Sequence, residues 1–316
     1  MPNLMLTNWC NYQCSYCFGM DFMAPKIAKQ NMSQATFAGI IEWLSKTPGV
    51  KSIHLMGGEP TLHPDFEWFA EYLLARDFNI TIFSNLATKQ ALLYAQKLAD
   101  LPVTWVVNIN PPDTWNENNK QRITAALQTL GAKATITFNV MPDEGNNTWA
   151  LDLIEAYHLN RVVKVGFVLP TLTGSNYYLV DDQYQEVAEK IVRLAQEAAK
   201  ANITFEYECG VPTCVFTEEQ LGILWQTGSA FDSCCYSRLD ITPDGKLIYC
   251  LPLATKHAIH FSEFPSYPEA RQWFEKKLQP YRRLGRTENC FQCNLLRPDS
   301  CHGGCLANIL LTAKHS

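Results

Sequence analysis

The sequence lacks long apolar runs, long basic runs, repeats and low-complexity tracts. No apolar run approaches the roughly 20 residues that span a bilayer, so a membrane-spanning helix is excluded. The absence of a long basic run and the formal net charge of -5 make nucleic acid a poor candidate for a partner. The first nine residues lack the basic start and apolar segment of a signal peptide, and we therefore expect a cytoplasmic protein.

Cysteine is missing from a long central stretch, although the chain of 316 residues contains 12 cysteines. Three of them precede residue 18, none lies between residues 18 and 208, and nine follow. In a reducing cytoplasm, clustered cysteines are more often metal ligands or catalytic groups than disulfide partners. The uneven distribution predicts two domains, at residues 1–205 and 206–316.

The cysteine-free middle alternates short β-branched or apolar runs with amphipathic stretches, which is typical of βα units around a parallel sheet. Six strands are expected, at residues 4–7, 52–56, 80–84, 103–108, 134–140 and 162–168. Helices are expected after a Ser33 cap, with Pro64 in a first turn, and over residues 181–201. The predicted fold class is α/β, a partial (β/α)6 TIM-type barrel followed by a small cysteine-rich domain of β-hairpin and helix.

The first cysteines, Cys10, Cys14 and Cys17, have the spacing C-x3-C-x2-C directly after the first expected strand. Three thiolates cannot complete a tetrahedral zinc site, but they can bind three irons of a cubane cluster and leave the fourth iron open. On spacing alone, a zinc site completed from elsewhere in the chain is equally possible.

The segment "HLMGGEP", residues 54–60, begins inside the second expected strand and continues past its end. Its Gly57 and Gly58 would let a ligand approach the backbone, and Glu59 offers a carboxylate, whereas His54 is expected to be packed. Alone, this segment would be a plain turn. Together with the three cysteines and the aromatic Phe18, it makes the sequence resemble the radical S-adenosylmethionine (SAM) superfamily.

The resemblance implies that the open iron of a 4Fe-4S cluster binds the amino and carboxylate groups of SAM, with Gly57, Gly58 and Glu59 helping to hold the amino group. One electron, from a donor such as flavodoxin or ferredoxin, would cleave SAM to a 5'-deoxyadenosyl radical that abstracts hydrogen from a substrate. Weaker candidates for contacts with SAM are residues at later strand ends: Ser84 and Asn85 in "FSNLAT", which replaces the family's Thr-Asn-Gly, Asn108, Asn139 and the segment "GFVLPTLTG" from residue 166.

The later cysteines begin with Cys209 in "ECGVPTC", and their paired spacings alone would favour structural zinc. Beside the first motif they resemble a SPASM domain, in which two auxiliary 4Fe-4S clusters are bound. The hairpin "CCYSRLDITPDGKLIYC", with a turn at residues 244–245, carries the family's Gly-x4-Cys. The resemblance implies eight ligands, namely Cys209, Cys214, Cys235, Cys250, Cys290, Cys293, Cys301 and Cys305.

The match to SPASM departs from the family pattern in two places. A C-x7-C spacing replaces C-x5-C, and the family's final cysteine is missing, so we expect Cys209 and Cys214 to replace the missing ligands. One cysteine is then left over, Cys234 or Cys235. It is either a small buried apolar residue or a hydrogen-atom donor of the kind that similar peptide epimerases use.

The resemblance favours a radical SAM maturase of a ribosomally made peptide, acting by cross-linking, oxidation or epimerisation. Many such maturases carry a leader-peptide-binding domain before the barrel, for which this chain has no room. A separate recognition protein, leader-free binding or a small-molecule substrate would each fit. The alternatives are a radical SAM dehydrogenase of a small metabolite and, from another class, a non-catalytic zinc or iron-sulfur protein that senses redox state.

Overall fold

The computed structural model describes residues 1–209, 211–229, 233–236, 238–297 and 300–315. Its strands are β1 Asn3–Thr7, β2 Ser52–Gly57, β3 Asn79–Ser84, β4 Val103–Asn108, β5 Ala134–Val140, β6 Val162–Phe167, β7 Thr204–Tyr207, β8 Asp240–Ile241, β9 Lys246–Ile248 and β10 Ile259–His260. Its α-helices are α1 Gln34–Ser45, α2 Phe66–Leu74, α3 Lys89–Lys97, α4 Glu117–Leu130, α5 Trp149–Ala156, α6 Asp181–Lys200, α7 Glu218–Gln226, α8 Tyr267–Arg282 and α9 Leu306–His315.

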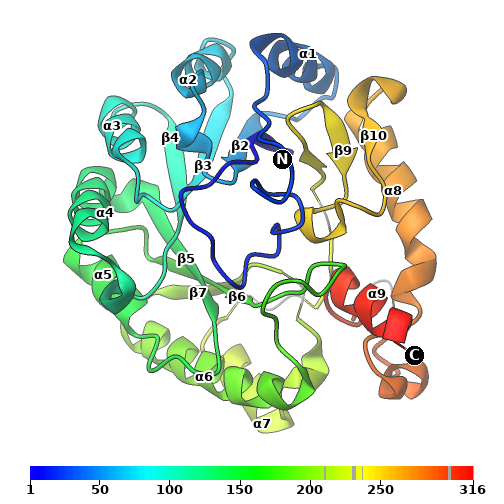
Figure 1. The fold of residues 1–316 in the computed structure, drawn as a ribbon. Helices are drawn as coiled ribbons and strands as arrows, with labels where there is room; N and C mark the ends of the chain where they lie inside the picture. The colour runs from blue at the N-terminus through cyan, green and yellow to red at the C-terminus, as the bar shows by residue number, and fades with distance from the viewer. Residues whose placement is uncertain (210, 230–232, 237, 298–299, 316) are drawn as a thin grey trace.

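Ten strands of the described residues form one sheet in the order β10-β9-β8-β1-β2-β3-β4-β5-β6-β7. Strands β1 to β7 pair in parallel in chain order, with a helix between each neighbouring pair. The sheet curves into a partial barrel, and helices α1 to α6 surround it (Figure 1). The predicted fold class is thereby confirmed, because right-handed crossovers between parallel strands curl the sheet in this way.

The prediction of six strands was incomplete, since β7 adds a seventh parallel strand beside β6. Among its four residues, Phe205 alone is fully buried, so the strand has too weak an apolar pattern to be recognised in the sequence. The helix expected to have Pro64 in its first turn begins two residues later, because residues 60–62 form a separate short 3-10 turn and Asp65 precedes α2.

The apolar core lies between the outer face of the sheet and the helices. Helix α1 starts at its predicted cap, where the Ser33 hydroxyl accepts a hydrogen bond from the Thr36 backbone N–H at 3.0 Å. It buries an apolar stripe that includes Phe37, whose ring stacks on Phe69 of α2. At the end of β4, Asn108 is exposed although β4 lies between β3 and β5.

The C-terminal region continues the same sheet through β8, which pairs in parallel with β1. Strands β8 and β9 form the predicted antiparallel hairpin, and Gly245 in its turn has a φ of +78°. Helix α8 lies outside this extension (Figure 1), and α9 packs against α8 and α6, where the Asn308 amide donates to the Tyr184 hydroxyl at 2.8 Å. No helix within the described ranges has the length and hydropathy needed to cross a membrane.

Candidate functional site

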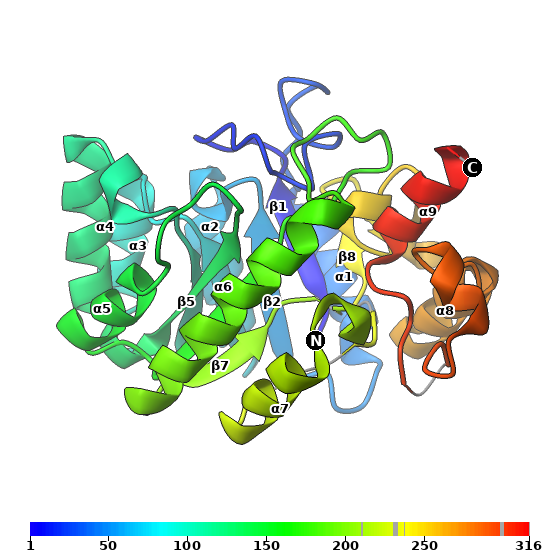
Figure 2. The ribbon, with the colours of Figure 1, turned by 90° about the horizontal axis from the view of Figure 1, so that it is seen from below.

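The three N-terminal cysteines lie on the loop that follows β1, referred to below as the cysteine loop (residues 8–30). This loop stands at the end of the barrel where the parallel strands finish, together with the loop after β6 (Figure 2). Within it, the Tyr12 backbone N–H donates to the Cys10 sulfur at 3.4 Å, and the Cys17 N–H donates to the Cys14 carbonyl oxygen at 3.1 Å. Burial raises the pKa of Cys10 to about 12, the Tyr12 N–H opposes this, and Glu59 and the two other thiols add to it. A bound cation such as iron would oppose this shift and favour the Cys10 thiolate.

The residues between the cysteines fasten the loop to neighbouring strand ends. The Asn85 side-chain amide donates to the Asn11 side-chain oxygen at 2.9 Å. The side-chain amide of Asn119, in α4, donates to the Tyr12 hydroxyl at 2.9 Å. The Tyr16 hydroxyl donates to the side-chain oxygen of Asn110, which follows β4. The loop is thus held by side chains that its own motif supplies.

Gly57 and Gly58 bring the end of β2 against the backbone that leads into the cysteine loop. A Cβ at Gly57 would overlap the Thr7 carbonyl, and one at Gly58 would overlap the Trp9 carbonyl and crowd the Cys10 nitrogen. The Gly58 N–H donates to the Thr7 carbonyl and the Glu59 N–H to that of Trp9, both at 2.8 Å. The glycines thus allow the end of β2 to pack directly against the backbone of residues 7–10.

Glu59 is fully buried, and its carboxylate accepts hydrogen bonds from the turn that follows it and from the end of β3. The donors are the Thr61 hydroxyl at 2.6 Å, the Ser84 hydroxyl at 2.9 Å and the Asn85 N–H at 2.8 Å. Burial raises the pKa of Glu59, and these donors oppose the shift. Glu59 therefore orients Ser84 and Asn85, and the Asn85 amide reaches the Cys10 sulfur at 3.8 Å.

The later candidates occupy the same end of the inner face. Asn108 is the last residue of β4, and Asn139 is the residue before the last in β5. The Asn139 side-chain oxygen lies so close to Gly166 of β6 that a Cβ there would overlap it. The sequence reasoning named no acid or base, but Glu208, directly after β7, lies beside Gly166. Burial raises the pKa of Glu208, whereas Lys164 and the Thr137 hydroxyl oppose the shift.

Four of the later cysteines come together from four separate segments: Cys209, Cys235, Cys250 and Cys305. Burial raises the pKa of Cys250 well above the usual thiol value, and the charges of the other three thiols raise it further. The pKa of Cys305 is raised to about 12 by burial and next by Cys235. Cys209 follows β7, which places this group beside the barrel.

A second group forms around Cys214, which follows the first group's Cys209 in the chain. Burial raises the pKa of Cys214, Arg286 lowers it, and the thiols of Cys290 and Cys301 raise it. Cys293 belongs to the same segment as Cys290, because its N–H donates to the Cys290 carbonyl at 3.2 Å.

The sequence left either Cys234 or Cys235 without an expected cluster, and the structure distinguishes the two. Cys235 contributes to the first group, whereas the Cys234 sulfur donates a hydrogen bond to the Ser300 carbonyl oxygen at 3.2 Å. His54, which the sequence predicted to be packed, is buried in β2 with its Nδ1 2.8 Å from the Asn3 side-chain oxygen.

The donor set fits the iron-sulfur clusters that the resemblance implies. Among the residues that the structure describes, no three Cys, His, Asp or Glu side chains are arranged around the position of one metal ion. Each thiolate of a 4Fe-4S cluster binds a different iron, so the ligands of one cluster stand apart instead of converging on a point. The neighbouring thiols of Cys209, Cys235, Cys250 and Cys305 suit the thiolate ligation of such a cluster.

Sequence comparisons connect the chain to proteins that use SAM. Residues 4–165 match the model of the Radical SAM superfamily. The S-adenosylmethionine-dependent nucleotide dehydratase of Selenomonas ruminantium is 34% identical over 83 residues, which are 26% of this chain and 28% of that relative. The match to this relative thus spans little more than a quarter of its length. The GTP 3',8-cyclase of Sulfurovum sp. (strain NBC37-1) is 25% identical over 266 residues, 78% of this chain and 77% of the cyclase.

Solved structures share the fold over nearly the whole chain, including its cysteine-rich end. SuiB of Streptococcus suis, bound to its precursor peptide SuiA, aligns with a TM-score of 0.68 at 14% identity over 97% of this chain and 72% of SuiB. The protein anSMEcpe with bound AdoMet aligns with a TM-score of 0.69 at 14% identity, over 96% of this chain and 89% of its own.

Members of the matched family use SAM together with a 4Fe-4S cluster. The family model covers just over half of the chain and contains both the three-cysteine loop and the Gly-Gly-Glu segment. This chain therefore belongs to the radical SAM superfamily.

Proposed function

We propose that the protein is a radical SAM enzyme that modifies a ribosomally made peptide. The observation that carries the proposal is that Cys209, shortly after β7 of the barrel, lies near Cys235, Cys250 and Cys305, while Cys214 lies near Cys290 and Cys301. Two auxiliary clusters in this position are a feature of the SPASM maturases that the sequence resembles. The proposal is supported by the fold shared with SuiB, whose structure contains a precursor peptide, and with anSMEcpe, which has also been solved with a peptide, Cp18Cys.

Each part of the site has a proposed role. Cys10, Cys14 and Cys17 would hold the SAM cluster, and the backbone of residues 57–59 with Ser84 and Asn85 would bind SAM, while Asn108 and Asn139 line the strand ends. When bound, the cluster and SAM supply a carbon-centred radical that removes a hydrogen atom from the substrate. Glu59 fixes the loop after β3, and the Tyr12 and Tyr16 hydroxyls hold the cysteine loop over the barrel.

We further propose a division of labour between residues 1–205, as the radical SAM barrel, and 206–316, as the auxiliary-cluster domain. An electron donor such as flavodoxin or ferredoxin would reduce the protein, and a separate protein would recognise the leader of the peptide. Location in the cytoplasm suits so many free thiols, because that compartment keeps them reduced.

A second candidate substrate is a nucleotide. The two curated relatives described above are named for reactions of nucleotides, and one of them aligns over 78% of this chain.

The experiment that separates the two candidates uses anaerobically reconstituted, reduced protein with SAM. One reaction receives the short peptides encoded beside its own gene, and the other receives ribonucleoside triphosphates. Mass spectrometry follows 5'-deoxyadenosine and both kinds of substrate, with the Cys14→Ala variant as the inactive control. A peptide mass change that requires SAM, or deuterium uptake by the peptide in D2O, is the expected result. If the peptides stay unchanged while a nucleotide is converted, the peptide proposal fails.

A further inference from the structure

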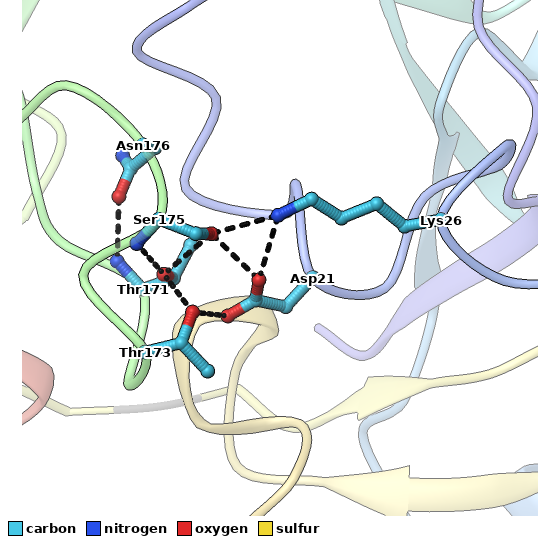
Figure 3. Close-up of polar contacts among 6 residues, drawn as sticks. All are labelled: Asp21, Lys26, Thr171, Thr173, Ser175 and Asn176. Carbon is cyan, nitrogen blue, oxygen red and sulfur yellow. Dashed lines mark hydrogen bonds and ion pairs between the residues drawn. The ribbon is translucent and has the colours of Figure 1, made fainter.

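Asp21, four residues after Cys17, joins the cysteine loop to the loop after β6 (Figure 3). One carboxylate oxygen accepts from the Ser175 hydroxyl at 2.7 Å and from the Lys26 ammonium at 3.1 Å. The other accepts from the Thr173 hydroxyl at 2.5 Å. Thr171 completes the set, with its hydroxyl 3.1 Å from that of Thr173 and 3.3 Å from that of Ser175. These five residues are called the Asp21 network below.

The same β6 loop also holds the backbone between the second and third cysteines. The Asn176 amide donates to the Tyr16 carbonyl at 3.2 Å, and the Tyr177 N–H donates to the Ser15 carbonyl at 2.8 Å. The Asn176 side-chain oxygen in turn accepts from the Thr171 N–H at 2.9 Å, so the two sets of contacts are parts of one structure. The loop after β6 therefore holds the cysteine loop at two places, between Cys14 and Cys17 and at Asp21.

This arrangement differs from an ordinary surface ion pair. An exposed pair such as Lys97 with Glu67 contributes little, because solvent screens it and both side chains lose freedom. Asp21 instead has hydroxyl donors on two residues of another loop as well as the lysine, and its side chain is 21% exposed. These donors hold the pKa of Asp21 at about 2 against the effect of burial, so the carboxylate stays charged at neutral pH.

Residues 171–177 lie outside residues 4–165, the part that the family model matches. The contacts between this loop and the cysteine loop connect segments about 150 positions apart, which local sequence preferences cannot bring together.

We propose that Asp21 is a positioning residue for the cluster-binding loop, acting through the loop after β6 to fix the segment between Cys14 and Cys17. The network sets where two of the three thiols stand relative to the strand ends, whatever the substrate. Failure of the peptide proposal would leave this inference intact, because its test needs no substrate.

The test compares the reconstituted full chain with Asp21→Asn, Asp21→Glu and, as a matched control, Asp100→Asn. Asp100 is an exposed aspartate in the turn before β4, at the opposite end of the barrel. Three quantities are measured: amide hydrogen exchange of residues 14–22 and 171–177, iron per chain, and the change that SAM produces in the EPR spectrum of the reduced protein.

We expect Asp21→Asn to speed exchange severalfold in both segments together and to alter the SAM-dependent EPR change, while residues 79–84 of β3 exchange as before. Asp21→Glu keeps the charge and should restore both signals in part, and Asp100→Asn should match the wild type. The double variant Thr173→Val and Ser175→Ala removes the donors from the other loop and should reproduce the Asp21→Asn result. The inference is overturned if Asp21→Asn and the Thr173→Val/Ser175→Ala double variant leave hydrogen exchange and the EPR change as in the wild type. It is also overturned if these two variants raise exchange equally throughout the chain.

Discussion

The two cysteine-rich regions of this protein are built in different ways. The N-terminal one carries Cys10, Cys14 and Cys17 on one loop, within eight consecutive residues. The C-terminal one collects its two groups from segments that extend from residue 209 to residue 305. Clustering within one loop makes the first site visible as a motif, whereas the second depends on how a hairpin, several turns and α9 pack together.

The largest expected effect comes from removing the local site. Replacement of Cys10, Cys14 and Cys17 by alanine should abolish SAM cleavage and lower the iron content from about twelve to about eight per chain, since a 4Fe-4S cluster is lost. Iron and zinc analysis of anaerobically reconstituted protein, beside an assay of 5'-deoxyadenosine, measures both effects. A variant that keeps zinc and no iron would instead make the C-terminal region a structural zinc domain.

The distributed region gives the next largest effect and tests its two groups. Cys250→Ala with Cys305→Ala removes two ligands from one group and should cost about four irons per chain. Cys250→Ala with Cys301→Ala removes the same number of thiols but leaves three in each group, and should cost fewer irons. Cys234→Ala is the control, with iron content as in the wild type. Equal iron losses in both double variants would contradict the grouping.

Gly58 tests how tightly the local site depends on the strand beside it. Gly58→Ala places a methyl group into the Trp9 carbonyl, and the resulting strain should lower the free energy of unfolding by about 1–3 kcal/mol. Gly145→Ala is the matched control, because a Cβ there meets nothing within 4 Å, and its effect should stay within about 0.5 kcal/mol. Urea unfolding of both variants measures the difference, and comparable losses would refute the assigned role of Gly58.

The junction between the two regions gives an effect that is visible only as a change in pH dependence. Asn3 of β1 hydrogen-bonds both His54 of β2 and Asp240 of β8. Burial, with Arg238 and the N-terminus adding to it, lowers the pKa of His54 to about 4. Burial raises the pKa of Asp240 to about 6, against donors from Asn3 and Leu251.

These two shifts act on stability in opposite directions. In the unfolded chain, His54 becomes protonated near pH 6.5. Its contribution to the free energy of unfolding is therefore complete above that pH and falls by about 3 kcal/mol as the pH drops through 4. The contribution of Asp240 is present below about pH 3.9 and is lost as the pH rises through 6. In the wild type the two nearly cancel. As the pH falls from 7 to 5, we expect the free energy of unfolding to rise for His54→Gln and to fall for Asp240→Asn. Urea unfolding at both pH values measures the two changes. Parallel pH profiles in the two variants would disprove this balance.

The sequence predicted much of the barrel because that information is local. Strands such as β5 are apolar runs, α1 shows its cap at Ser33, and the hairpin turn shows its glycine at position 245. The strand β7 escaped prediction because it is short and buries little, so pairing with β6 creates it.

For the site, the sequence by itself determined the candidate residues: the three-cysteine spacing, the Gly-Gly-Glu segment and the number of later cysteines. The tertiary structure decided how they are arranged. It packs Gly58 against the Trp9 backbone and makes the Glu59 carboxylate accept a hydrogen bond from the Asn85 N–H. It also places Cys235, and not Cys234, near Cys305, and Asp21 within hydrogen-bond distance of Ser175. The physical reason is separation along the chain. Contacts between residues far apart depend on strand order and on the packing of whole elements, which no short pattern of residues contains.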